Sequence, residues 1–180
     1  MNAFFTRKKF LLTGGLAAVA SLLPRSQGLA QISPAPAASQ SPGTPSNTPD
    51  RGPQLDLARV KQFVIAGHGN LPVVKEMLAA EPALINGTWD WGGGDFETAL
   101  GGASHMGRRD IAEFLLEHNA RMDLFAATML GHLEIVKSAV AVFPGIVRVP
   151  GPHKIPLIVH AEKGGEPAVA VLNFLRPLVG

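Results

Sequence analysis

One short segment, residues 89–97, concentrates the side chains best suited to binding chemistry; it reads WDWGGGDFE. Two tryptophans separated by one acidic residue are typical of the aromatic anchors that proteins insert into a partner. The three glycines permit backbone turns that other residues rarely adopt. We therefore expect a surface that contacts a partner protein through Trp89, Asp90, Trp91, Asp95 and Glu97. The alternative is that one or both indoles are buried, as tryptophan side chains usually are.

Histidines outside this segment are the other candidates. His105 and His153 are assigned to the same partner-binding surface, whereas we expect His68 and His118 to be solvent-exposed at turns. A second hypothesis is a metal- or small-molecule-binding protein, or an enzyme, whose site is formed by three histidines and three acidic residues: His105, His153, His160, Asp90, Asp95 and Glu97. No two histidines have the four-residue spacing of ligands on one helix, and the chain has no cysteine. The sequence by itself therefore identifies no metal ligands and no cofactor.

A repeated pattern of glycines and apolar pairs predicts the elements that position these residues. Glycines occur at 69, 107, 131 and 164, and an apolar residue that ends a helical stretch follows the first three by nine positions: Leu78, Leu116 and Val140. In the second copy, the apolar residues at 111, 112, 114 and 115 have the three- and four-residue spacing of one helix face. Helices this short are marginal alone in water, so each must bury its apolar face against the next pair. We therefore expect a stack of helix pairs.

The pattern resembles the ankyrin repeat. In the second copy the matching residues are Thr98, Leu100, Ala103, Gly107, Ile111, Leu115, Leu116 and Ala120. The third copy matches at Gly131-His132 and Ile135-Val136, and the fourth at Pro156-Leu157, Ala161 and Gly164. The resemblance covers residues 54–180 and implies an all-α, ankyrin-like solenoid of about four helix-turn-helix repeats that binds a protein through its loops and groove.

Two departures from the family pattern affect the expected site. The histidine of the family's Thr-Pro-Leu-His motif is replaced by Gly101 and Ile158. The interval from Gly69 to Gly107 exceeds the roughly 33 residues of an ankyrin unit, whereas the interval from Gly107 to Gly131 falls short of it. We therefore expect an enlarged loop before the second copy, which contains residues 89–97, and almost no loop before the third.

The N-terminal residues have the features of an export signal. Basic residues at 7–9 precede a mildly apolar stretch over 10–23, and small residues at 28–30 suit cleavage after Ala30. The stretch TRKKFL is similar to a twin-arginine export motif with lysine in place of the second arginine. We expect a signal peptide over 1–30, a disordered Pro- and Ser-rich linker over 31–53, and a periplasmic or secreted protein without stable membrane insertion. An uncleaved membrane anchor is the alternative.

Charge and composition exclude several functions. The signal contains four of the 16 basic residues, so the remaining chain has fewer basic than its 14 acidic residues and no basic run. A nucleic-acid partner would require a clustered positive face. Neither a Gly-x-Ser-x-Gly motif nor a phosphate-binding loop nor a dinucleotide fingerprint occurs. We expect a non-catalytic protein that is a monomer or a weak homodimer.

Overall fold

The computed structural model describes residues 51–180, and the fold below refers to these residues alone. The predicted signal peptide and all but the last three residues of the predicted linker lie outside them. The described chain is mainly helical, as expected, with eight α-helices. Their bounds are α1 Leu57–Gly67, α2 Leu71–Ala80, α3 Ala99–Met106, α4 Arg109–Glu117, α5 Leu124–Met129, α6 Leu133–Val142, α7 Leu157–Lys163 and α8 Val169–Val179.

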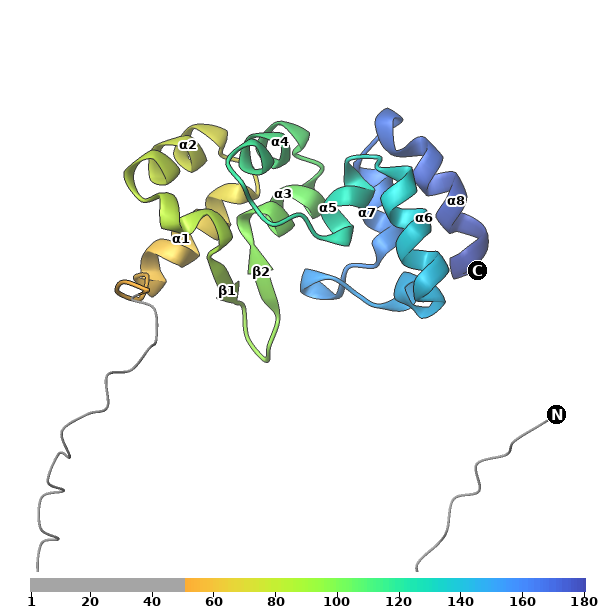
Figure 1. Cartoon of the computed structure of the whole chain (residues 1–180), viewed down its shortest axis with the longest axis horizontal. Helices are drawn as coiled ribbons and strands as arrows, with labels where there is room; N and C mark the ends of the chain where they lie inside the picture. The colour runs from red at the N-terminus through yellow and green to blue at the C-terminus, as the bar shows by residue number, and fades with distance from the viewer. Residues whose placement is uncertain (1–50) are drawn as a thin grey trace, which may run out of the picture. The chain divides into compact units, whose positions relative to one another are not determined.

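The helices form successive antiparallel pairs in which the first members lie side by side. α1 packs against α3, α3 against α5, and α5 against α7 (Figure 1). Each even-numbered helix packs against the odd-numbered helix before it in the chain. None of the helices in residues 51–180 has the length and apolar character needed to cross a membrane.

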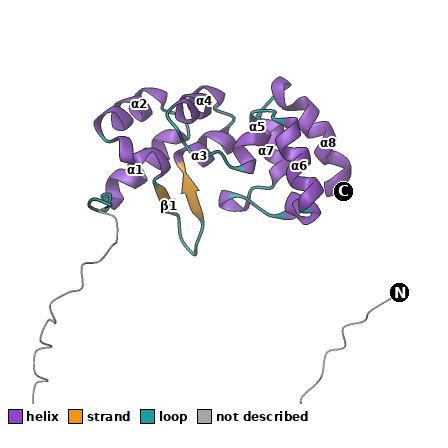
Figure 2. Ribbon diagram, viewed as in Figure 1, coloured by secondary structure: helices purple, strands orange, loops and turns teal. Residues whose placement is uncertain are grey.

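A two-stranded hairpin occupies the enlarged loop that the sequence predicts between the first and second helix pairs. Strand β1, Thr88–Asp90, pairs antiparallel with β2, Phe96–Thr98, so that Trp89 lies opposite Glu97. Figure 2 shows these strands as the extended segment that projects below the helices. The loop before the third pair is short but not absent, as the sequence predicted it nearly to be: α4 ends at Glu117 and α5 begins at Leu124.

Capping side chains help to fix where three of the helices begin, namely α1, α3 and α5. Asp56, Thr98 and Asp123 each accept a hydrogen bond from the backbone N–H three residues later, which satisfies a donor that the first helical turn leaves unpaired. Thr98 is both the last residue of β2 and the cap of α3. The chain therefore passes directly from the hairpin into a helix, which fixes Glu97 relative to His105 in the last turn of α3.

Glycine is required at two of the predicted turns for different reasons. Gly107 ends α3 in the left-handed region with φ of 71°, as the sequence predicts. Gly164 has an ordinary helical φ of −69°, and the left-handed residue there is Gly165. A Cβ at Gly164 would lie 2.1 Å from the carbonyl oxygen of Met129, so close packing of neighbouring pairs excludes a side chain.

The apolar side chains form two clusters along the row of helices. The first is centred on buried residues of the first two pairs, including Phe63, Leu100 and Leu115. The second includes Val171 and Leu175 of α8. Both of these side chains are fully buried, so this face of α8 is covered at Val171 and Leu175. Burial in each cluster depends on helices from more than one pair.

Candidate functional site

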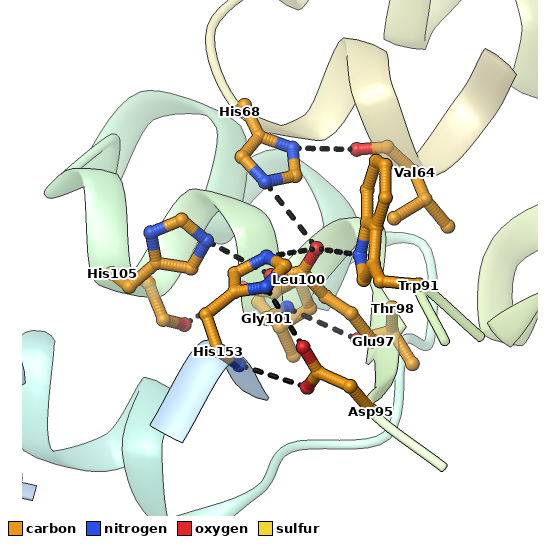
Figure 3. Close-up of polar contacts among 11 residues, drawn as sticks. Val64, His68, Trp91, Asp95, Glu97, Thr98, Leu100, Gly101, His105 and His153 are labelled. Atoms are coloured by element: carbon orange, nitrogen blue, oxygen red, sulfur yellow. Dashed lines mark hydrogen bonds and ion pairs between the residues drawn. The ribbon is translucent and has the colours of Figure 1, made fainter. Parts of the chain in front are cut away.

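The buried carboxylate of Glu97 is the centre of a polar cluster. Glu97 is only 1% exposed, although it lies in a short strand of a projecting hairpin. Its Oε1 lies 2.9 Å from Nε2 of His105, and its Oε2 accepts a 2.7 Å hydrogen bond from the indole N–H of Trp91. Nε2 of His68 and Nε2 of His153 each lie 3.3 Å from Oε2 (Figure 3). Three imidazoles and one indole thus surround a single carboxylate.

These side chains come from four parts of the chain. His68 follows the last turn of α1, Glu97 and Trp91 belong to the hairpin region, and His105 lies in α3. His153 lies in the segment between α6 and α7, within a 3₁₀ turn over Pro152–Lys154. The four possible ligand atoms, one each from the three histidines and Glu97, all lie within 4.8 Å of one another.

In two of the histidines, the ring nitrogen that faces away from Glu97, Nδ1, already has a hydrogen-bond acceptor. Nδ1 of His68 lies 3.0 Å from the carbonyl oxygen of Val64, and Nδ1 of His153 lies 3.0 Å from Oδ2 of Asp95. A carbonyl or carboxylate oxygen only accepts, so both Nδ1 atoms donate. If the imidazole is neutral, its Nε2 carries no hydrogen, and the lone pair of this nitrogen points at the negatively charged Glu97 carboxylate, which repels it. A second proton on the ring or a cation between the groups removes this repulsion.

Asp95 fixes the position of His153. Besides its contact with Nδ1, the Asp95 carboxylate accepts a 2.8 Å hydrogen bond from the backbone N–H of His153. This pair joins residues 58 positions apart in the chain. Both His153 and Lys154 have positive φ values, 56° and 59°, which are uncommon for residues with side chains. The two hydrogen bonds to Asp95 help to hold the turn in this conformation.

The protonation of the cluster follows from these contacts. Burial by itself would raise the pKa of Glu97, but hydrogen bonds from His105, His68 and Trp91 outweigh it and lower the pKa well below its usual range, so the carboxylate is ionised. The hydrogen bond to Glu97, opposed by partial burial, raises the pKa of His68 above its usual value.

The structure brings five of the seven predicted site residues together: Trp91, Asp95, Glu97, His105 and His153. Trp89 does not join them, because its indole packs against the first apolar cluster with the Lys61 ammonium 5.1 Å from the ring. Asp90 is also outside, since its carboxylate accepts hydrogen bonds from the N–H groups of Gly92 and Gly94 at the hairpin turn. The alternative of indole burial therefore applies to Trp89, which is half-buried, while Trp91 is 37% exposed.

The third histidine of the metal-site hypothesis lies outside the cluster. His160 is fully buried beside the ring of Phe125, where burial lowers its pKa, and it is not part of the cluster. His68 occupies the place in the cluster that the metal-site hypothesis gave to His160, although the sequence predicted that His68 would be a solvated turn residue. His118 shows why no local signal identifies His68. Each of the two caps the C-terminus of a helix with Nδ1 bonded to the carbonyl four residues earlier, yet His118 is exposed, as predicted.

The chemistry of this donor set is that of a first-row transition metal site. Imidazole nitrogen together with one carboxylate suits Zn²⁺, Fe²⁺, Co²⁺, Ni²⁺ or Cu²⁺, whereas Mg²⁺ and Ca²⁺ prefer oxygen ligands. A histidine whose outer nitrogen donates to a carboxylate or a backbone carbonyl is the usual arrangement behind a metal ligand. His153 with Asp95 and His68 with Val64 have this arrangement.

Comparison with known proteins adds no functional assignment. No family model, no curated protein and no solved structure matches this chain.

Proposed function

We propose that this protein binds a divalent transition metal ion through His68, Glu97, His105 and His153. The supporting observation is the convergence of three Nε2 atoms on one buried carboxylate, within 4.8 Å, while the Nδ1 hydrogens of His68 and His153 are already bonded to other acceptors. A bound cation would accept the lone pairs that otherwise oppose the Glu97 oxygens.

The distances are compatible with an ion of this class. Ligand atoms about 2.0–2.1 Å from a tetrahedral ion lie about 3.3–3.4 Å apart. His68 and His153 each have Nε2 at 3.3 Å from Oε2 of Glu97. Small side-chain movements would therefore bring these groups to ligating distance.

The scaffold of the proposed site is an ankyrin-like stack. The support is the side-by-side row of α1, α3, α5 and α7, with a second helix following each, and the left-handed glycine after α3. The stack makes the site possible because it holds residues of separate helix pairs at fixed distances. The predicted export signal would place the site in the periplasm or outside the cell.

Metal content and titration of the full chain test this proposal. Purified protein stripped with EDTA is titrated with Zn²⁺ and Co²⁺, and we expect one ion bound per chain. His68→Asn is the test variant and His118→Asn its matched control, because both histidines cap helix ends with the same Nδ1 hydrogen bond. We expect His68→Asn to weaken binding at least about 100-fold, beyond the usual effect of residues behind the ligands, and His118→Asn to bind like the wild type. Equal affinity of the two variants would exclude the site.

Protein binding is the second candidate function. The exposed side of the hairpin region includes Phe96, which is 60% exposed, and Trp91, and such apolar residues are unfavourable in water. Glu97 and His105 are buried, so a partner would contact the rim residues Trp91, Asp95 and His153. Crosslinking in intact cells from a photoreactive probe at position 96, with and without Trp91→Ala, tests this function. Unchanged partners in the variant would exclude Trp91 as the anchor.

A further inference from the structure

We infer that the metal ion keeps an exchangeable coordination position on its solvent side, where it binds a small oxyanion in place of water. This inference rests on the proposed function and concerns what the metal centre does. The class of ligand is an anion with carboxylate or phosphate oxygens.

The exposure of the surrounding side chains is strongly one-sided. The Glu97 side chain is fully buried and that of His105 is 8% exposed, whereas His68 and His153 are 25% and 33% exposed. Structural metal sites are closed by protein ligands, while sites that act on other molecules leave a position for water or substrate. The partial exposure of these two imidazoles shows that the His68 and His153 side of the cluster faces solvent.

The spacing of the ligand atoms also leaves room for an additional ligand. Four ligands closed around a tetrahedral ion would lie about 3.4 Å apart at most. The four ligand atoms here spread over distances of up to 4.8 Å. The four groups are therefore not closed around a tetrahedral ion, and a fifth ligand from solution has room beside them.

Trp91 provides a wall on the open side without competing for the metal. Its ring lies edge-on to His68, with centroids 6.1 Å apart, and 5.6 Å from the ring of His153. The indole N–H is its one hydrogen-bond donor, and this donor is directed at Glu97. The tryptophan therefore lines this side of the cluster but offers no ligand atom to a metal ion.

The adjoining cavity has a cation that suits the second oxygen of an anion. A cavity of about 410 Å³ is lined by the glycines 92–94, Gly151, Asp95 and Lys154. Asp95 joins it to the cluster, because the same carboxylate holds His153. The oxygens of Asp95 and Oδ1 of the nearby Asp90 already accept hydrogen bonds, which reduces their repulsion of an anion. Lys154 is exposed and can pair with the anion.

The visible spectrum of the Co²⁺ form of the full chain tests this inference. Azide, acetate and phosphate are titrated separately at constant ionic strength. We expect each to change the d–d bands with saturation, and acetate and phosphate to compete with azide. Lys154→Met should raise the dissociation constants of acetate and phosphate about two- to fivefold, the size expected for an exposed ion pair, while Co²⁺ affinity stays unchanged.

The outcomes separate the two proposals. Failure to bind Co²⁺ would overturn the metal site and this inference together. If Co²⁺ binds stoichiometrically but none of the three anions changes the spectrum at 100 mM, the inference alone would be overturned. A response to azide without one to acetate or phosphate would show an open position and overturn the assignment to oxyanions.

Discussion

Replacing Glu97 by glutamine removes the charge at the centre of the cluster while preserving the shape of the side chain. The carboxylate faces Trp91 Nε1 at 2.7 Å, His105 Nε2 at 2.9 Å and His68 Nε2 at 3.3 Å, in a fully buried position. A hydrogen bond to a charged group contributes about 1.5–3 kcal/mol, and one between neutral groups about 0.5–1.5 kcal/mol. At a pH below the raised pKa of His68, both nitrogens of that ring carry protons and Nε2 donates to Glu97. Loss of the charge then weakens the hydrogen bonds from Trp91, His105 and His68 by about 1 kcal/mol each, so we expect Glu97→Gln to lower the free energy of unfolding by about 3 kcal/mol.

Urea denaturation of the full chain in EDTA measures this effect without metal. The matched control is Glu113→Gln, because Glu113 is an exposed carboxylate paired with Arg109 on the surface of α4. We expect the control to lie within about 0.5 kcal/mol of the wild type. With Zn²⁺ present, the difference between wild type and Glu97→Gln should widen, since an ion that binds only the folded state adds to its stability.

A stability of Glu97→Gln equal to that of the control in EDTA would refute the reasoning. It would mean that the contacts of Glu97 contribute no net free energy to the metal-free fold. A variant that is destabilised in EDTA but gains as much from Zn²⁺ as the wild type would retain the structural role of Glu97 and exclude it as a ligand.

Three further predictions follow from individual contacts. Gly131→Ala should destabilise the fold by more than about 2 kcal/mol, because a Cβ there would lie 2.1 Å from the carbonyl oxygen of Pro167. The control Gly93→Ala changes a glycine with a similar positive φ in open space and should cost only about 1 kcal/mol. Thermal unfolding measures both variants. Asp95→Asn should weaken Zn²⁺ binding about 10- to 100-fold by loosening His153, and calorimetry that finds unchanged affinity would contradict it. The pKa of His68 is raised, so protons compete with the metal for this imidazole as the pH falls through that pKa. The Zn²⁺ dissociation constant should therefore rise by up to about tenfold for each pH unit towards acid. A dissociation constant that stays the same or falls towards acid pH would contradict this prediction.

Much of the fold follows from local patterns in the sequence. Apolar residues at three- and four-residue spacing predict α4, and Gly107 ends α3 where a left-handed residue is needed. The long interval between Gly69 and Gly107 predicts the enlarged loop. The hairpin within that loop could not be predicted in detail, because its strands have only three residues each and no clear alternation.

The candidate site was predictable only in part. Trp91, Asp95, Glu97, His105 and His153 stand out as polar or aromatic residues in or near irregular segments. Their arrangement around one carboxylate does not follow from spacing, because the hydrogen bonds of the cluster join residues up to 58 positions apart. Such convergence depends on how the helix pairs and the two loops pack.

The sequence by itself determined the helix pairs, their glycine turns and the segment that contains Glu97, because these depend on interactions between residues a few positions apart. Only the tertiary structure decided which histidines meet that carboxylate. His68 and His118 have the same local hydrogen bond at the end of a helix, yet only His68 lies beside Glu97. The difference is that the hairpin between the first two helix pairs folds back over the end of α1 and carries the Glu97 carboxylate to His68.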